Sequence, residues 1–92
     1  VYGKYAEMRF RFLKEYKKIT YTELLTTGKL NEHLQQIQDR ARQRVEFLIN
    51  QMAKNEQVTE ELKAKDPMKW VRMMNNIKNR AEEIVINEIV YC

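Results

Sequence analysis

Residues 67–90 read PMKWVRMMNNIKNRAEEIVINEIV, a stretch in which apolar side chains return every three or four residues. The positions of this series are Trp70, Met74, Ile77, Ala81 and Ile84, followed by Glu88 and Tyr91. Alternating spacings of four and three form a heptad pattern, which is typical of a long helix that packs along another helix. Asp66 is a good N-cap and proline is tolerated at the first helical position, so we predict a helix over residues 67–90.

A second long helix is predicted over residues 30–54. Its series is Leu30, Leu34, Ile37, Ala41, Arg44, Leu48 and Met52, and a connector at residues 55–66 holds one or two turns capped by Thr59. The two helices share a short match, IQDRARQRV at 37–45 and IKNRAEEIV at 77–85, with four of nine positions identical. The match indicates either an ancient duplication or two helices that pack through small residues. In both cases Ala41 and Ala81 are the candidates for a close crossing.

Shorter helices are predicted in the N-terminal third. Residues 4–18 carry an apolar stripe made of Tyr5, Met8, Phe12, Leu13 and Tyr16, with basic side chains on the opposite side. Thr20-Tyr-Thr-Glu23 matches the capping box, so a short helix is expected to open there and to end at Gly28. The expected fold class is all-α: a helical hairpin of two long helices (about 30–54 and 67–90) with short N-terminal helices packed across it. We expect one domain over residues 1–92, and because the chain begins with Val1 we expect a native N-terminal segment to be missing.

Three charged residues fall at positions where an apolar side chain is expected: Arg9, Arg44 and Glu88. A buried charge is rarely left without a partner. One interpretation is that Glu88 pairs with Arg9 or Arg44, within the chain or across a dimer. The other is that these positions lie at exposed helix ends.

The positive charge is concentrated near the N-terminus. Residues 1–18 contain six basic and two acidic side chains, whereas residues 19–92 contain eleven of each, so the net charge of +4 lies in the first 18 residues. A phosphate backbone or an acidic partner would be attracted to such a segment. The candidate nucleic-acid-binding residues are Lys4, Arg9, Arg11, Lys14, Lys17 and Lys18.

Aromatic residues gather in the same segment. Six of the nine lie there: Tyr2, Tyr5, Phe10, Phe12, Tyr16 and Tyr21. Rings beside cations are typical of single-strand binding, but most of these rings lie on the apolar stripe and are expected to pack in the core. Phe10 lies off the stripe, and an exposed Phe10 would mark a contact surface for a partner or for the missing N-terminal residues.

Several classes of function lack support. With one histidine, His33, and one terminal cysteine, Cys92, the chain cannot build a usual zinc site, and we expect neither metal nor cofactor. No phosphate-binding glycine loop and no nucleophile–base set is present, so no enzymatic activity is expected. No apolar run reaches the roughly 20 residues of a membrane span. The absence of a disulfide framework suits a cytoplasmic location.

Three stretches resemble the transposon-encoded protein TnpV family: GKYAEMRFRFLKEY at residues 3–16, LLTTGKLNEHL at residues 24–34 and WVRMMNNIKNRAEEIVINEIVY at residues 70–91. The similarity covers essentially the whole chain, and the third stretch is the most specific. The resemblance implies a small protein of mobilisable or conjugative elements of Gram-positive bacteria, encoded near site-specific recombinases. It implies an excisionase-like or DNA-binding accessory role and assigns no catalytic or base-reading residue.

Two functions are therefore expected as alternatives. The first is a mobile-element accessory protein that binds DNA and assists a recombinase. Helix-turn-helix binding through residues 23–34 is disfavoured, because Glu32 and Asp39 would repel phosphates at the start of an unusually long second helix. The second is a non-enzymatic interaction or dimerisation module of the recombination or transfer machinery. A homodimer would be favoured by apolar residues off the main series, such as Phe47, Ile86 and Val90.

Overall fold

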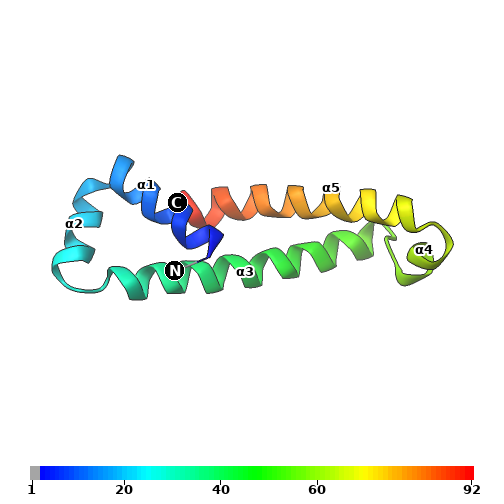
Figure 1. The fold of residues 1–92 in the computed structure, drawn as a ribbon, viewed down its shortest axis with the longest axis horizontal. Coiled ribbons are helices and arrows are strands. Elements are labelled where there is room, and N and C mark those ends of the chain that lie inside the picture. Colours follow the sequence, from blue (N-terminus) through cyan, green and yellow to red (C-terminus); the bar gives the residue numbers. More distant parts are fainter. Residues whose placement is uncertain (1–2) are drawn as a thin grey trace.

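Two long antiparallel helices form the body of the molecule (Figure 1). The computed structural model describes residues 3–92. Helices α3 (Leu30–Asn55) and α5 (Pro67–Val85) lie side by side, and α4 (Glu60–Lys65) lies in the connection between them. The radius of gyration is 16.7 Å and the extents are 55 × 20 × 19 Å, whereas a compact domain of this length would have a radius of gyration of about 12 Å. The molecule is a rod.

Three further helical segments close the end of the rod that lies opposite α4. Helix α1 (Lys4–Tyr16) packs on α3, and α2 (Lys18–Thr26) leads from α1 into α3. The last segment, η1 (Ile86–Val90), continues α5 as a π-helical turn and contacts both α1 and α3. The predicted all-α hairpin with short N-terminal helices across it is confirmed. None of the helices in the described part of the chain combines the length and apolarity needed to cross a bilayer.

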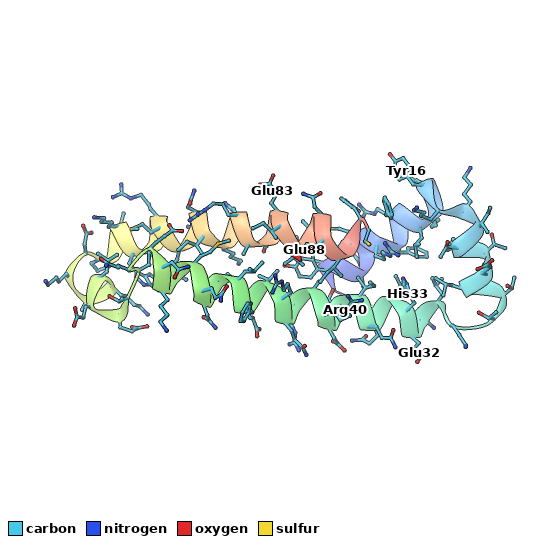
Figure 2. All side chains as sticks on the ribbon, turned by 180° about the vertical axis from the view of Figure 1, so that it is seen from behind. Tyr16, Glu32, His33, Arg40, Glu83 and Glu88 are labelled. Atoms are coloured by element: carbon cyan, nitrogen blue, oxygen red, sulfur yellow. The ribbon has the colours of Figure 1, made fainter. Side chains whose placement is uncertain are left out.

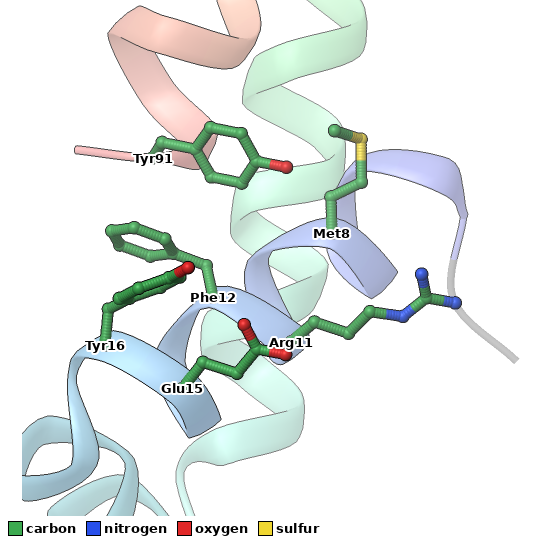
Figure 3. Close-up of a pocket in the computed structure, with 6 residues that line it drawn as sticks. All are labelled: Met8, Arg11, Phe12, Glu15, Tyr16 and Tyr91. Atoms are coloured by element: carbon green, nitrogen blue, oxygen red, sulfur yellow. The ribbon is translucent and has the colours of Figure 1, made fainter.

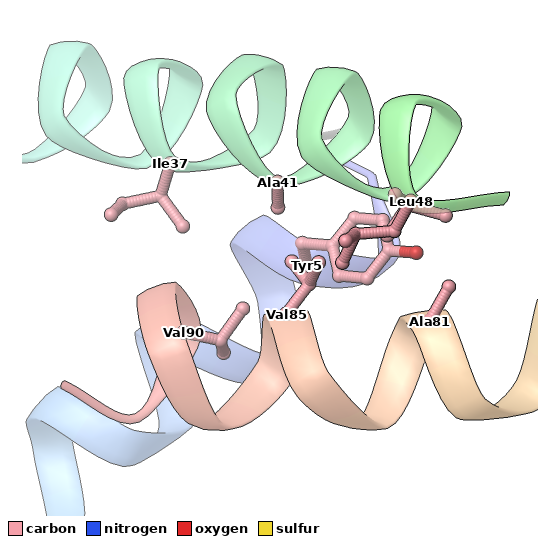
Figure 4. Close-up of a cluster of buried hydrophobic side chains, with 8 residues drawn as sticks. Tyr5, Ile37, Ala41, Leu48, Ala81, Val85 and Val90 are labelled. Carbon is pink, nitrogen blue, oxygen red and sulfur yellow. The ribbon is translucent and has the colours of Figure 1, made fainter. Parts of the chain in front are cut away.

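The core runs along the facing sides of α3 and α5 and is covered by α1 (Figure 4). Its buried members are Tyr5, Ile37, Ala41, Val45, Leu48, Ala81, Val85 and Val90. Both predicted alanines are fully buried. Figure 4 shows Ala41 across from Val85 and Ala81 across from Leu48, so each alanine receives a larger side chain from the opposite helix. This exchange of small and large residues allows the helices to pack without voids.

The buried side of α5 differs from the predicted heptad series. The structure buries Ile77, Ala81, Val85 and Val90, at spacings of four, four and five. The positions predicted at 84, 88 and 91 are exposed, so that part of the prediction is wrong. A straight α-helix drifts by about 20° per heptad away from a strict seven-residue repeat. The π-turn adds one residue, with the amide of Tyr91 donating to the carbonyl of Ile86 at 2.9 Å, and it brings Val90 back to the core.

Two of the three predicted charged positions, Arg44 and Glu88, are exposed, whereas Arg9 is half-buried. On α3, Val45 occupies the buried position next to Arg44. The Nε of Arg44 lies 3.6 Å from Oε2 of Glu88, and the two side chains are 42% and 45% exposed. Both interpretations of these positions hold in part: Glu88 pairs with Arg44 and not with Arg9, and the pair is solvated. An exposed pair of this kind contributes at most about 1 kcal/mol to stability.

Of the four signals for helix ends predicted from the sequence, three are confirmed and one is wrong. The side chains of Thr59 and Asp66 accept hydrogen bonds from Leu62 and Lys69, as N-caps do. Gly28 has a φ of 72°, the left-handed conformation expected after a helix. The capping box at Thr20 is wrong, because α2 already begins at Lys18 and Thr20 lies inside it.

The N-terminus of α1 is capped by another helix. Oε1 of Gln38, on α3, accepts hydrogen bonds from the backbone amides of Tyr5 and Ala6, both at 3.0 Å. These two amides belong to the first turn, whose donors have no partner within their own helix. The N-cap residue Gly3 lies against the same glutamine, and a Cβ at Gly3 would overlap its side chain. The contact fixes where α1 begins on α3.

The Gln38 cap predicts a specific loss of stability. In Gln38→Ala, two amides of α1 lose their acceptor, and we expect the free energy of unfolding to fall by about 1–2 kcal/mol. Gln38→Glu keeps the acceptor oxygen and adds a negative charge at the positive end of α1, so it should retain stability. Urea unfolding followed by circular dichroism measures both. Gln43→Ala, at an exposed position of the same helix, is the control, and an equal loss in the control would contradict the capping role.

Candidate nucleic-acid interface

The six basic candidates do not share one surface. Lys4 forms an ion pair within the fold. Its Nζ lies 2.8 Å from Oε2 of Glu82 on α5, and this ion pair joins the first turn of α1 to the hairpin. The hydrogen bond to Glu82 raises the pKa of Lys4, against the opposing effect of burial. A lysine that already has a carboxylate partner offers little attraction to a phosphate.

Arg9 is also used within the fold. Its Nη1 donates to the backbone carbonyls of Val90 at 3.0 Å and Cys92 at 2.8 Å. Its Nε donates to Nε2 of His33 at 3.3 Å. The side chain is half-buried, and burial lowers the pKa of its guanidinium from a usual value far above neutrality. Arg9 thus holds α1 against both the C-terminal turn and α3, and it is not available to DNA.

His33 serves as a hydrogen-bond acceptor in this cluster. Burial is the main cause that lowers the pKa of His33, and the nearby charges of Arg9 and Arg40 lower it further. Within residues 3–92 no group of three or more histidine, cysteine, aspartate or glutamate side chains is placed to hold a metal ion. The imidazole of His33 accepts a hydrogen bond from the half-buried Arg9 and so links α3 to α1.

Arg11 is exposed, but acidic residues surround it. Glu7 and Glu15 lie four residues before and after it, which places all three on the same outward face of α1. The two carboxylates offset the charge of Arg11. This part of the outer face of α1 therefore carries no excess positive charge.

The remaining positive charge gathers where α1 meets α2. Lys14, Lys17 and Lys18 are exposed there, and we refer to these three lysines as the basic corner. None of the three takes part in an ion pair within the described residues. The backbone turns at Lys17, with φ −130° and ψ 56°, so one chain segment presents lysines from the end of one helix and the start of the next.

Phe10 stabilises this junction. Its ring lies 5.9 Å from the ring of Tyr21 on α2, and the ammonium of Lys14 lies 4.8 Å from the Phe10 ring. Phe10 is half-buried, so the exposed Phe10 that would have marked a contact surface is not found. The ring instead packs α1 against α2.

An aromatic groove lies beside the basic corner (Figure 3). It has a volume of about 490 Å³ and is lined by Met8, Arg11, Phe12, Glu15, Tyr16 and Tyr91. The Phe12 ring lies 5.6 Å from that of Tyr16 and 5.1 Å from that of Tyr91. Tyr5 packs in the core as predicted, whereas Tyr16 is 72% exposed. Tyr2 lies outside the described residues.

Sequence reasoning missed the groove because it placed Tyr91 in the hairpin core. The π-turn before Tyr91 moves that ring out of the core series and over α1. A spacing of five between two core positions, Val85 and Val90, is the signal that could have revealed the turn.

A second surface feature lies on one flank of the hairpin, and we refer to it as the flank groove. It is lined by Arg40, Gln43, Arg44, Phe47, Glu88 and Ile89 (the labelled Arg40 and Glu88 are visible in Figure 2). The guanidinium of Arg44 lies 5.4 Å from the Phe47 ring, which is 49% exposed. The other two residues expected at a dimer contact are used within the chain, because Val90 is buried and Ile86 packs against the core.

The state of His33 predicts a pH dependence of stability. A histidine whose pKa is lower in the folded chain than in the unfolded chain binds fewer protons when folded. Its contribution is therefore fully present above the unfolded pKa of about 6.5 and is lost as the pH falls from there through the lower pKa of the folded chain. We expect the melting temperature to decline between pH about 7 and 5, and His33→Gln, which keeps an acceptor but cannot titrate, to decline less. Parallel profiles would show that His33 does not contribute.

Comparisons with known proteins point to one family. The family model described as transposon-encoded protein TnpV matches residues 1–90. No match was found among curated proteins or among solved structures. The matched range runs from before α1 to the end of η1, so it covers the basic corner, the flank groove, the whole hairpin and all residues of the aromatic groove except Tyr91. The chain belongs to the transposon-encoded protein TnpV family.

Proposed function

We propose that this chain is a mobile-element accessory protein that binds DNA through the basic corner and assists a site-specific recombinase, as an excisionase does. Membership of a transposon-encoded family associates the chain with a mobile element. In this proposal the protein acts in the cytoplasm and catalyses no step itself. It supplies a contact to DNA, and the recombinase supplies the chemistry.

The observation that carries the proposal is the basic corner. Lys14, Lys17 and Lys18 are exposed, close together in the chain and without carboxylate partners in the described residues. Away from the first 18 residues the charges of the chain balance. DNA would therefore approach the α1–α2 end of the rod in preference to the α4 end.

Contacts of this kind position a protein on DNA but do not read its sequence. Lysines that touch phosphates bind any duplex, and specificity requires contacts to base edges or a dependence on DNA shape. Helix α3 is not presented as a recognition helix, because it packs against α1, α2, α5 and η1. Preference for the ends of the parent element would have to come from DNA shape or from the recombinase.

Salt dependence and charge removal test the proposal together. Three phosphate contacts predict a roughly 40-fold loss of affinity for duplex DNA between about 50 and 200 mM salt. We expect the triple variant Lys14→Gln, Lys17→Gln, Lys18→Gln to bind much more weakly and to lose most of that salt dependence. Fluorescence anisotropy with duplexes from the ends of the parent element, and with a scrambled duplex, measures both effects.

A matched control separates a local contact from overall charge. The triple variant Lys54→Gln, Lys65→Gln, Lys69→Gln removes the same charge from exposed positions around α4, at the opposite end of the rod. We expect it to bind nearly as the native protein does. Equal losses in the two triple variants would contradict a role for the corner, and no binding to any duplex at the lower salt would overturn the proposal.

The flank groove favours a second candidate function, a protein-interaction or dimerisation module. An exposed aromatic ring beside an arginine is the composition that interface centres prefer. In this alternative Phe47 enters a second copy of the chain or the recombination machinery, and DNA is not contacted.

Oligomeric state tests the alternative directly. If Phe47 lies in a dimer interface, light scattering coupled to size-exclusion chromatography should show a dimer whose population grows with concentration. Phe47→Ser should shift this equilibrium to monomer, because the variant removes the apolar anchor. Val71→Ser, at another exposed apolar position of the hairpin, should leave the equilibrium unchanged. A native protein that stays monomeric at every concentration would exclude the homodimer.

A further inference from the structure

We propose that the aromatic groove binds an unstacked base of single-stranded DNA, next to phosphates held by the basic corner. This inference rests on the proposed DNA-binding function and adds to it a class of ligand, a single-stranded tail or a locally opened step. The base occupies the aromatic groove, and the basic corner binds phosphates of the same strand.

The arrangement of the rings supports the proposal. Phe12 forms the half-buried wall of the groove, with the rings of Tyr16 and Tyr91 on its two sides. Figure 3 shows Met8 beside Tyr91, while Arg11 and Glu15 lie on the other side of the opening. Tyr16 leaves most of its surface in solvent, so its ring is accessible to a ligand that stacks on it. The volume of about 490 Å³ falls within the range of small-ligand sites.

The charges near the groove select a nucleic acid over a neutral ligand. Lys17 and Lys18 follow Tyr16 directly in the chain, whereas the charge of Arg11 in the groove is offset by nearby carboxylates. A strand whose base stacks on Tyr16 would therefore carry its adjacent phosphates to the basic corner. Stacking platforms beside a cationic track are the arrangement by which proteins bind single strands without reading their sequence.

Glu15 sets the direction in which a strand can lie. Its carboxylate lines the groove and repels phosphate, so the backbone of a bound strand would have to pass outside the groove. A carboxylate at the mouth of the groove can accept a hydrogen bond from an exocyclic amino group of a base. Glu15 is thus compatible with a base in the groove and incompatible with a phosphate there.

A blunt duplex cannot use the groove, because its bases are stacked on one another. The experiment compares a blunt duplex with the same duplex carrying a single-stranded tail of about six nucleotides, a length within the site sizes of single-strand-binding folds. We expect the tailed probe to bind about tenfold more tightly in anisotropy titrations. Tyr16→Leu should abolish this gain, and Tyr16→Phe should keep it.

The choice of variants separates stacking from other roles. Tyr16→Leu keeps an apolar side chain but removes the ring, and an exposed position can be changed without unfolding the chain, which circular dichroism verifies. Ile19→Ala removes a neighbouring apolar residue that is 78% exposed and does not line the groove, so it should keep the full gain.

The outcomes distinguish this inference from the proposed function. Equal binding of the tailed and blunt probes, or a full gain in Tyr16→Leu, would overturn the stacking site while binding of the blunt duplex still supported the basic corner. If no probe binds, both proposals fail. Loss of the gain in Ile19→Ala as well as in Tyr16→Leu would point to a general apolar contact and would also overturn base stacking.

Discussion

Arg9 reaches from α1 to the backbone carbonyls of Val90 and Cys92, and this contact closes a three-helix core at one end of a two-helix rod. Two packed helices bury only the apolar stripe along their facing sides, and the apolar side chains at the edges of that stripe stay exposed to water. Helix α1 covers the edge with Tyr5, Ala6 and Leu13, all buried. Gln38 satisfies the first amides of α1 from α3, so α1 is held at its first turn by one polar contact and at its second turn by another.

This closure decides which charges remain for a partner. The fold takes Lys4 and Arg9 out of the basic segment, one into an ion pair with Glu82 and one into contacts with carbonyls. Arg11 stays in solvent between two glutamates. The excess positive charge therefore does not spread along α1 but collects past its last buried residue, Leu13. The basic stripe predicted from the sequence is therefore a small basic corner in the structure, and this corner lies beside the aromatic groove.

Sequence alone predicted the hairpin, because its signals are local. The N-caps Thr59 and Asp66 and the left-handed Gly28 act within one helical turn, and tertiary contacts did not override them. Apart from the capping box at Thr20, the failures are long-range. The partners of Lys4 and Arg9 lie 78 and 81 residues away, so no local pattern separates these two from the exposed lysines. The buried positions of the last turn were mispredicted for a related reason. The π-turn places Val90 in a core that also contains Tyr5 of α1, and this contact is distant in the sequence.

The residues that hold α1 in the fold are separate from those proposed to bind DNA, so the DNA-binding hypothesis can be tested by mutation. The residues of α1 that hold the fold point inward and lie at or before Leu13, whereas the basic corner and Tyr16 lie after it and point into solvent. Changing an exposed side chain away from a buried contact usually alters stability by less than about 0.5 kcal/mol. A variant of the corner that stops binding DNA has therefore lost a contact and not its structure. A variant of Arg9 would not separate the two effects, because loss of its side chain would release α1 and disturb both the aromatic groove and the basic corner. Among the six basic residues, only those that the fold does not use can report on function.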